Sequence, residues 1–193
     1  YNEEAGDKAV QWIERYCTHV KGELGGKPFI LEDWQKDDII RPLFGTLRDD
    51  GLRQYRQAYI EVPRKNGKSN LCAAIALYLL FADGEPGAEI ISAAGDRNQA
   101  RIVFEIASAM CANNAKLHGH GKVLRNSIHY KNSFYKAISA EANTKHGFNA
   151  HAVILDELHV FPNRDLYDVL KTSTGARTQP LVIAITTAGH DTS

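Results

Sequence analysis

The segment VPRKNGKSN, residues 62–70, stands between an alternating run that includes Ala58, Ile60 and Val62 and the apolar stretch LCAAIALYLLF. This change of hydrophobic period predicts a strand, a tight turn and a helix. The turn ends in Gly-Lys-Ser at 67–69, the end of the phosphate-binding pattern G-x-x-x-x-G-K-[ST], although Val62 stands where the first glycine belongs. Because a bare Gly-Lys-Ser is common by chance, a simple capped helix start is the alternative interpretation.

A loop of this kind holds phosphates with its backbone N–H groups, here those of residues 65–69, and with the N-terminus of the following helix. Lys68 would reach the β- and γ-phosphates of a nucleotide, and the Ser69 hydroxyl would bind Mg²⁺. The predicted nucleotide-binding loop consists of Pro63, Arg64, Lys65, Asn66, Gly67, Lys68, Ser69 and Asn70.

The segment AVILDELH, residues 152–159, supplies the acids that such a loop needs. Four apolar residues run into Asp156 and Glu157, which predicts two carboxylates at the C-terminal edge of a buried strand. Open parallel sheets bind their ligands at that edge. Asp156 would hold the Mg²⁺ shell, and Glu157 would polarise a water for attack on the γ-phosphate. Two solvated loop acids are the alternative.

A third segment, LVIAITTAG at 181–189, is an apolar strand that ends in Thr186 and Thr187. Hydroxyl groups at that point would sense the γ-phosphate or fix the attacking water. Threonine is also simply frequent in strands, so the residue type alone leaves both interpretations open.

Hydrophobic periodicity and turn residues divide the whole chain into alternating helices and strands. The predicted helices cover residues 4–20, 32–45, 67–82, 96–113 and 164–173, with Asp96 as an N-cap. The predicted strands cover residues 55–62, 88–94, 122–130, 133–140, 151–157 and 180–188, and the third and fourth form a hairpin through Lys131 and Asn132. Continuous apolar strands separated by helices indicate a mainly parallel sheet covered on both faces, so the predicted fold is a three-layer α/β domain.

The composition is that of an ordinary globular protein: 193 residues, enough for one domain, with 44% hydrophobic and 24% charged residues. The formal net charge is zero, so a DNA-contacting surface would have to be a local patch. The three cysteines lack zinc-binding spacing, and HGHGK at 118–122 offers two histidines without a third ligand, which favours a solvated loop. No apolar run is long enough to span a bilayer.

Together these motifs resemble the ATPase domain of the large terminase subunit of tailed double-stranded-DNA bacteriophages. PFILEDWQ at 28–35 is similar to the family's adenine-recognition motif, PRKNGKS to its deviant Walker A motif, and SAAGDRNQARIVFEIA to its segment after the second strand. GFNAHAVILDELH resembles its Walker B region, and ITTAG its coupling motif. The resemblance implies one P-loop NTPase domain of the additional-strand (ASCE) type. Residues 1–50 would carry the N-terminal helices and adenine motif, and residues 51–193 would form the core.

The resemblance also implies roles for individual residues. Gln35 would read the adenine base. Arg64 would point at the γ-phosphate as a cis-acting arginine finger, a role worth roughly 10³–10⁵ in rate, whereas a structural ion pair is the alternative. Lys65 would be dispensable. Some family members use a basic residue of a neighbouring subunit in the loop before the Walker B strand, where this chain has no arginine and Lys145 is the substitute candidate.

For the whole protein, the resemblance implies a motor that uses ATP and Mg²⁺ to package double-stranded DNA in the host cytoplasm. It would act transiently at the portal vertex as a ring of about five subunits, with the portal protein and the small terminase subunit as partners and no membrane. The ending AGHDTS, directly after a strand, indicates a piece of a larger protein. The family's nuclease domain has no counterpart up to Ser193, so we expect ATP hydrolysis without DNA cleavage from this chain.

Two other functions stay open at this point. The first motor domain of a superfamily-two helicase shares an upstream Gln motif and a Ser/Thr coupling motif, and Asp156–His159 resembles its DExH tetrad. Asn66 stands where helicases keep a glycine or small residue, and their DNA-contact motifs are not recognisable here. The other alternative is a nucleotide-binding scaffold without turnover, which would not need Glu157 beside the Mg²⁺ carboxylate.

Overall fold

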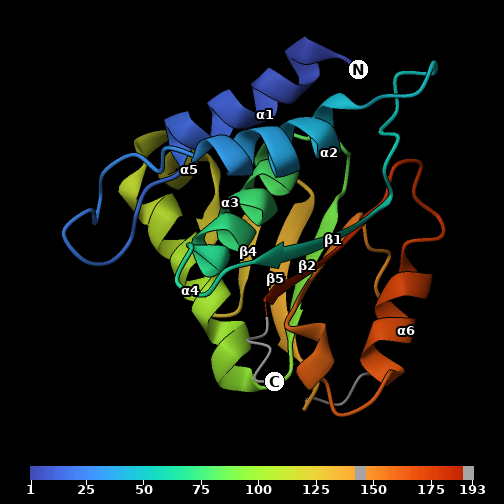
Figure 1. The fold of residues 1–193 in the computed structure, drawn as a ribbon. Helices are drawn as coiled ribbons and strands as arrows, with labels where there is room; N and C mark the ends of the chain where they lie inside the picture. The colour runs from blue at the N-terminus through green and yellow to red at the C-terminus, as the bar shows by residue number, and fades with distance from the viewer. Residues whose placement is uncertain (142–146, 189–193) are drawn as a thin grey trace, which may run out of the picture.

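The computed structural model describes residues 1–141 and 147–188, so the candidate Lys145 lies outside the described residues. Within them the chain forms one sheet in the order β1-β7-β6-β2-β5-β4-β3, with helices on both faces (Figure 1). The strands are β1 (Gln57–Val62), β2 (Glu89–Ala94), β3 (Lys122–Val123), β4 (Ser127–Tyr130), β5 (Ser133–Ser139), β6 (Ala152–Asp156) and β7 (Leu181–Thr187). The helices are α1 (Glu3–Tyr16), η1 (Gln35–Ile40), α2 (Arg41–Gly45), α3 (Lys68–Phe81), α4 (Arg97–Asn113), α5 (Ala115–His120), η2 (Leu158–Val160) and α6 (Asp165–Ser173).

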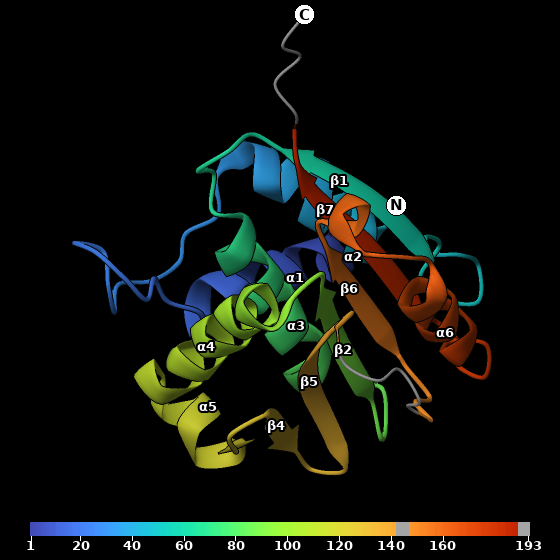
Figure 2. The ribbon, with the colours of Figure 1, turned by 90° about the horizontal axis from the view of Figure 1, so that it is seen from below.

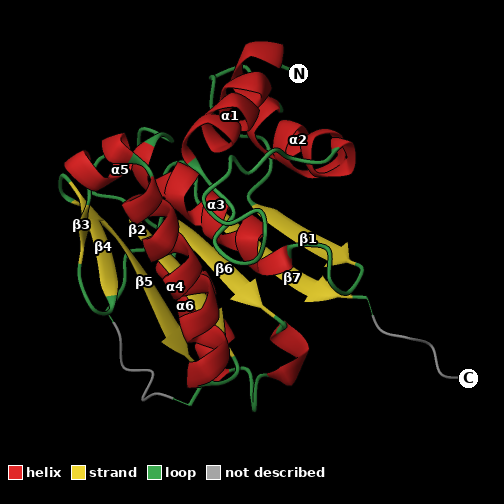
Figure 3. Ribbon diagram, turned by 90° about the vertical axis from the view of Figure 1, so that its left-hand side faces the viewer, coloured by secondary structure: helices red, strands yellow, loops and turns green. Residues whose placement is uncertain are grey.

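The sheet is mainly parallel, as the sequence predicts. β1, β7, β6, β2 and β5 run parallel, whereas β4 pairs antiparallel with β5, and β3 pairs antiparallel with β4. Figure 3 shows the arrowheads of β1, β7 and β6 directed to the same edge of the sheet. β7 lies between β1, which leads into the Gly-Lys-Ser turn, and β6, which carries the acids. This inserted strand is the additional strand of the ASCE type, and the predicted fold class is confirmed.

Neighbouring residues of the central strands enter two different cores, because side chains alternate between the faces of a sheet. Ile90 and Ile154 belong to the core that includes α3 and α4, whereas Ile91 and Val153 belong to the core with α6. Figure 2 shows α3 and α4 on one side of the sheet and α6 on the other. α3 lies between the sheet and α1, which explains why its residues 71–80 are all buried and apolar around the whole helix.

The first predicted helix, 4–20, was too long. It ends at Tyr16, because Cys17 takes an extended backbone and Thr18 forms an antiparallel bridge with Pro28. Val20 fits the helical spacing, but it packs on the core from the following loop. The second predicted helix, 32–45, exists, although its middle is the π-helical turn η1.

Two local predictions between residues 113 and 130 were also wrong. The predicted strand 122–130 is two strands, because Leu124 turns back and donates its N–H to the Ser127 carbonyl at 2.8 Å. HGHGK is not a loop: His118 and His120 lie exposed on α5, which Asn114 caps. Among the described residues no cluster of three or more His, Cys, Asp or Glu side chains could hold a metal ion. None of the described helices is long and apolar enough to cross a membrane.

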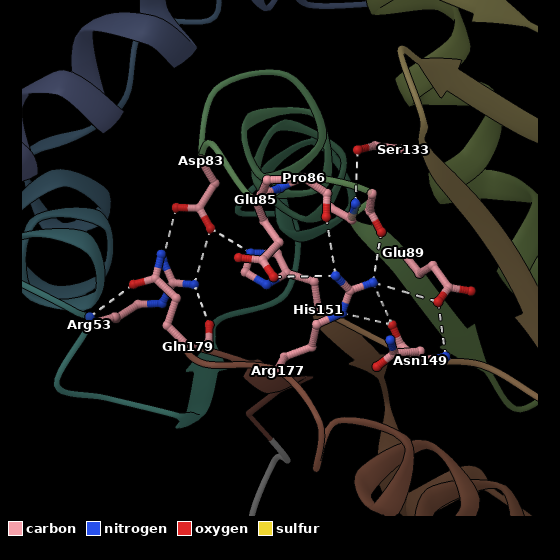
Figure 4. A network of polar contacts seen from close by, with 12 residues as sticks. Arg53, Asp83, Glu85, Pro86, Glu89, Ser133, Asn149, His151, Arg177 and Gln179 are labelled. Carbon is pink, nitrogen blue, oxygen red and sulfur yellow. Dashed lines mark hydrogen bonds and ion pairs between the residues drawn. The ribbon is translucent and has the colours of Figure 1, made fainter.

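The N-terminal edge of the sheet is held by a network of buried arginine contacts (Figure 4). Arg53, with a side chain only 3% exposed, makes a bidentate ion pair with Asp83 and donates to the Gln179 carbonyl. His151 contacts the same Asp83 carboxylate at 2.7 Å. Arg177 binds Glu85 and the carbonyls of Pro86, Gly87 and Asn149. These contacts join the segments that precede β1, β2, β6 and β7, so they stabilise the sheet at the edge opposite to the Gly-Lys-Ser turn.

Candidate nucleotide-binding site

The turn between β1 and α3 has the backbone of a preformed phosphate loop. Gly67 has a φ of 72°, and Lys65 also has a positive φ, 62°. A left-handed backbone is unfavourable for a residue with a side chain, so the surroundings must hold Lys65 there. The Asn66 amide does part of this, since its Nδ2 donates to the carbonyls of Pro63 and Arg64 at 3.2 and 3.1 Å.

The first turn of α3 lacks the side-chain cap that α1, α4 and α5 have. α1, α4 and α5 begin with Asn2, Asp96 and Asn114, and each of these side chains accepts from a first-turn N–H group. The N-cap of α3 is Gly67, which has no side chain to do so. Uncapped N–H groups and the helix dipole favour an anion at this point, and Lys68 adds a positive charge. The geometry therefore favours a phosphate loop over a simple capped helix start.

Lys68 lies between the two acids of β6. Its Nζ is 2.6 Å from Asp156 Oδ1 and 2.6 Å from Glu157 Oε1, and the three side chains are only 11%, 3% and 15% exposed. Burial alone would lower the pKa of Lys68, but its hydrogen bonds to the two carboxylates outweigh burial and raise the pKa. The two acids are thus not solvated loop charges, because they meet the lysine of the loop at the C-terminal edge of the sheet.

Glu157 is held from three sides. Its backbone is left-handed, with a φ of 53°, and its N–H donates to the Ile185 carbonyl at 2.9 Å. Thr187 donates its N–H and its hydroxyl to Oε1 at 3.0 and 2.8 Å, and the Thr186 hydroxyl donates to Oε2. Burial would raise the pKa of Glu157, but the hydrogen bonds from Lys68, Thr186 and Thr187 lower it to about 2. A strained backbone at a buried acid points to a functional position.

The end of β7 lies beside the phosphate loop. Val62 pairs with Thr187 in the sheet, and the N–H of Ala188 donates to the Val62 carbonyl at 2.8 Å. The two threonines are therefore more than frequent strand residues, because both contact the Glu157 carboxylate. The sequence could not distinguish these possibilities, since the contact depends on β7 inserting between β1 and β6.

Two further side chains belong to the site. Gln99, in the first turn of α4, donates its Nε2 to Asp156 Oδ2 at 3.0 Å. It lies three residues after the N-cap Asp96. The surrounding segment resembles the terminase family, but that resemblance implied no role for Gln99. Its contact requires β2 and β6 to be neighbours, which the local sequence does not specify. His159 Nδ1 lies 3.2 Å from the Thr186 hydroxyl, although the ring is largely exposed.

The other predicted site residues have different surroundings. Arg64 is exposed on the loop and makes no ion pair with any described residue, which does not support the structural alternative. Ser69 and Asn70 lie half-buried in the first turn of α3. Gln35 is buried in η1, where its Oε1 accepts from the Glu32 N–H at 2.9 Å.

The acid pair also fits Mg²⁺. The oxygens of Asp156 and Glu157 already converge on one cationic group, the Lys68 ammonium. Carboxylate and hydroxyl oxygens are the ligands that Mg²⁺ prefers. Asp156 and Ser69, on neighbouring elements at the same edge, would hold the ion.

A parallel sheet with an additional strand, a glycine-lysine-serine loop and an adjacent acid pair define a P-loop NTPase fold of the ASCE type. The comparisons with known proteins specify it further. The family model for "Terminase large subunit, ATPase domain" matches residues 33–193. The chain belongs to this family.

Among curated proteins, the chain is similar to the "Terminase, large subunit" of Enterobacteria phage HK97, with 36% identity over 94% of this chain and 36% of the relative. The crystal structure of the HK97 large terminase matches with a TM-score of 0.81 and 33% identity over 94% of this chain and 37% of that one. The large terminase ATPase domain of Thermus phage P74-26 matches with a TM-score of 0.58 and 20% identity, over 79% of this chain and 70% of that one, which bears on the fold alone. The chain spans about a third of the HK97 relative, and no comparison favours a helicase.

Proposed function

We propose that this chain binds and hydrolyses ATP with Mg²⁺ and thereby drives double-stranded DNA into a procapsid. The observation that carries the proposal is the meeting of Lys68, Asp156 and Glu157 at the C-terminal edge of the sheet, in a chain of the terminase ATPase family. Residues 1–193 would act as one ATPase domain, since the core cluster joins the N-terminal helices to α3. Pro63, Arg64, Lys65, Asn66, Gly67, Lys68, Ser69 and Asn70 would surround the phosphates.

Lys68 would change partners when a nucleotide binds. In this structure its ammonium forms ion pairs with both Asp156 and Glu157. A triphosphate is a stronger acceptor within reach of the same flexible side chain, so Lys68 would leave the acids for the β- and γ-phosphates. Mg²⁺, when bound by Asp156 and Ser69, would neutralise charge on the phosphate oxygens. Asp156 thus exchanges one cation for another, and its negative charge stays compensated throughout.

Glu157 would then orient the attacking water. Loss of the Lys68 contact removes a hydrogen bond that lowers its pKa, so the carboxylate becomes a better proton acceptor. Thr186 and Thr187 would keep it in position and pass the state of the γ-phosphate into β7. Arg64 would stabilise charge that develops on the transferred phosphoryl group, as an arginine finger does. Gln35 would contact the adenine base.

The proposed surroundings follow from the family and not from this chain alone. A ring of about five subunits would dock on the portal protein of the procapsid, with the small terminase subunit delivering the DNA. The location would be the host cytoplasm and, transiently, the portal vertex.

The test compares ATP turnover and ATP binding of the chain with those of Glu157→Ala and Glu157→Gln over a range of protein concentrations. We expect hydrolysis by the wild type, rising with concentration as subunits meet, and variants that bind ATP but turn it over at least ~10²-fold more slowly. Glu61→Gln, an exposed acid on β1, is the matched control and should behave as wild type. Equal turnover in all four proteins would show that Glu157 is not catalytic. Tight binding without turnover in the wild type would instead support the scaffold alternative.

A further inference from the structure

An open groove of about 590 Å³ lies between α4 and the β4–β5 hairpin. Figure 2 shows α4 beside these strands, on the side of the sheet away from α6. Four cationic side chains line the groove: Arg97 and Arg101 from α4, Arg125 from the turn before β4, and Lys136 from β5. No acidic residue is among the lining residues. In a chain with a formal net charge of zero, this groove is a local basic patch.

The arginines of the groove are available to a ligand. Arg97 and Arg125 are exposed and have no hydrogen-bond or ion-pair partner among the described residues. Arg101 makes one ion pair, with Glu105 at 3.4 Å, and both side chains are more than half exposed. Such a pair contributes little stability and exchanges easily. Arg53, in contrast, is buried against Asp83 at the far edge of the sheet.

The chemistry of the groove fits the phosphate backbone of a duplex. Arg97 and Arg101 are four residues apart and therefore share one face of α4. Asn98 and Asn126 add neutral amide donors, and these side-chain types make most of the phosphate contacts in protein–DNA complexes. The aromatic lining residue, Phe104, is only 7% exposed, so the groove offers no ring on which an unpaired base could stack.

We propose that this groove binds the phosphate backbone of double-stranded DNA. The inference rests on the proposed packaging function for the choice of DNA among polyanions. It assigns a DNA-contacting surface, whose position the sequence alone did not specify. α4 also connects this surface to the nucleotide site: its first turn directs Arg97 and Asn98 to the groove and Gln99 to Asp156.

The experiment measures binding of a random-sequence DNA duplex to the chain by fluorescence anisotropy at several salt concentrations. Arg97→Ala/Arg125→Ala is compared with Arg15→Ala/Lys21→Ala, which removes the same charge from exposed residues outside the groove. Each phosphate contact adds about 0.9 to the salt exponent, so we expect roughly tenfold weaker binding per groove cation near 0.1 M salt and a salt slope reduced by about 2. The control should keep wild-type affinity and slope. ATP turnover without DNA should stay unchanged in both variants, because none of the four residues belongs to the nucleotide site.

Several outcomes would overturn the inference. Equal DNA affinity of the groove variant and the wild type, equal weakening in groove variant and control, or no DNA binding by the wild type would each exclude the groove as the DNA surface. If the groove instead receives an acidic surface of a second subunit, the groove variant will change self-association and leave DNA affinity intact. The proposed ATP hydrolysis is tested separately, by the ATP turnover of Glu157→Gln. None of these DNA-binding outcomes decides that test.

Discussion

A buried ion network lies at each end of the parallel strands, one at the N-terminal edge of the sheet and one at the C-terminal edge, and the two networks differ in their contacts. At the N-terminal edge, Arg53 and Arg177 bind backbone carbonyls as well as acids. At the C-terminal edge, the Lys68 ammonium contacts two side chains among the residues that the structure describes, those of Asp156 and Glu157. A guanidinium fork with several fixed acceptors has one favourable geometry, whereas an ammonium on a flexible chain can change partners without moving the backbone.

Backbone strain follows the same division. Of the described residues other than glycine, only Lys65, Lys131 and Glu157 have positive φ, and two of these lie at the C-terminal edge. Buried ion pairs are therefore not evidence of function by themselves. What distinguishes the Lys68 network is that its cation is a flexible ammonium, that Glu157 has a strained backbone, and that a helix start without a side-chain cap adjoins it.

The largest expected effect concerns the cations of the loop. Arg64→Ala should lower kcat by about 10³–10⁵, because a finger acts on charge that develops only in the transition state, while ATP affinity stays close to that of the wild type. Lys65→Gly is the matched control: it removes the neighbouring cation and suits the positive φ at that position, so its kcat should be near wild type. Single-turnover kinetics with radiolabelled ATP measure the rate of hydrolysis and the ATP affinity of each variant. A loss in Lys65→Gly as large as that in Arg64→Ala would contradict the assignment.

The second effect compares the two networks directly. Lys68→Met leaves the carboxylates of Asp156 and Glu157 without their cation, and Arg53→Met leaves Asp83 with His151 alone. Removing one partner of a buried ion pair costs about 3–5 kcal/mol of unfolding free energy. Millimolar Mg²⁺ should restore much of this loss in Lys68→Met, because the ion can replace the ammonium between Asp156 and Glu157. Chemical denaturation with and without Mg²⁺ measures the difference. Arg53→Met should gain nothing from Mg²⁺, because among the described residues only one carboxylate, that of Asp83, faces the Arg53 side chain, whereas two face the Lys68 ammonium. Equal rescue of both variants would contradict this distinction.

The third comparison concerns the loss of unfolding free energy at low pH, to which one acid of each network contributes. Burial would raise the pKa of Asp83, but its contacts with His151 and Arg53 lower it to about 2, and the pKa of Glu157 is also about 2. A lowered pKa in the folded state gives stability that is complete above the unfolded-state value, near 4, and is lost as the pH falls toward 2. For Asp83 this amounts to on the order of 2 kcal/mol.

Asp83→Asn and Glu157→Gln should each therefore show a shallower loss of unfolding free energy between pH 4.5 and pH 2 than the wild type, as measured by urea denaturation. ATP and Mg²⁺ should distinguish the two variants: in the proposed exchange Lys68 would leave Glu157, whose pKa would rise, whereas Asp83 would keep its partners. Retention of the full wild-type acid slope in both variants would contradict this account.

The sequence predicted those features of the fold and of the candidate site that depend on local residue patterns. The periods of residues 55–82 specify strand, loop and helix, and the residue types at 67–69 and 156–157 specify the chemistry. It did not predict the features that depend on strand order. The contact of Gln99 with Asp156 needs β2 beside β6, and the contacts of the threonines with Glu157 need β7 between β6 and β1. The ion pair of Arg53 with Asp83 likewise depends on the fold, because it joins the segments before β1 and β2.

The smallest expected effect concerns α4, which contacts both the candidate nucleotide site and the basic groove. Gln99→Met keeps the length and helix propensity of the side chain but removes the hydrogen bond to Asp156 Oδ2. A hydrogen bond to a charged group contributes about 1.5 kcal/mol, so Mg²⁺-dependent ATP affinity should fall by roughly tenfold. Because Gln99 does not line the groove, DNA affinity should stay unchanged, while any acceleration of turnover by DNA should be reduced.

Ser108→Ala, later on the same helix, is the control for this comparison. The Ser108 hydroxyl has no hydrogen-bond partner among the described residues, so its removal should leave ATP affinity, DNA affinity and stimulation by DNA at their wild-type values. Fluorescent-nucleotide titrations and turnover assays with and without a DNA duplex measure all three quantities. If Gln99→Met kept both wild-type ATP affinity and wild-type stimulation by DNA, α4 would be a support for the groove and not its connection to the nucleotide.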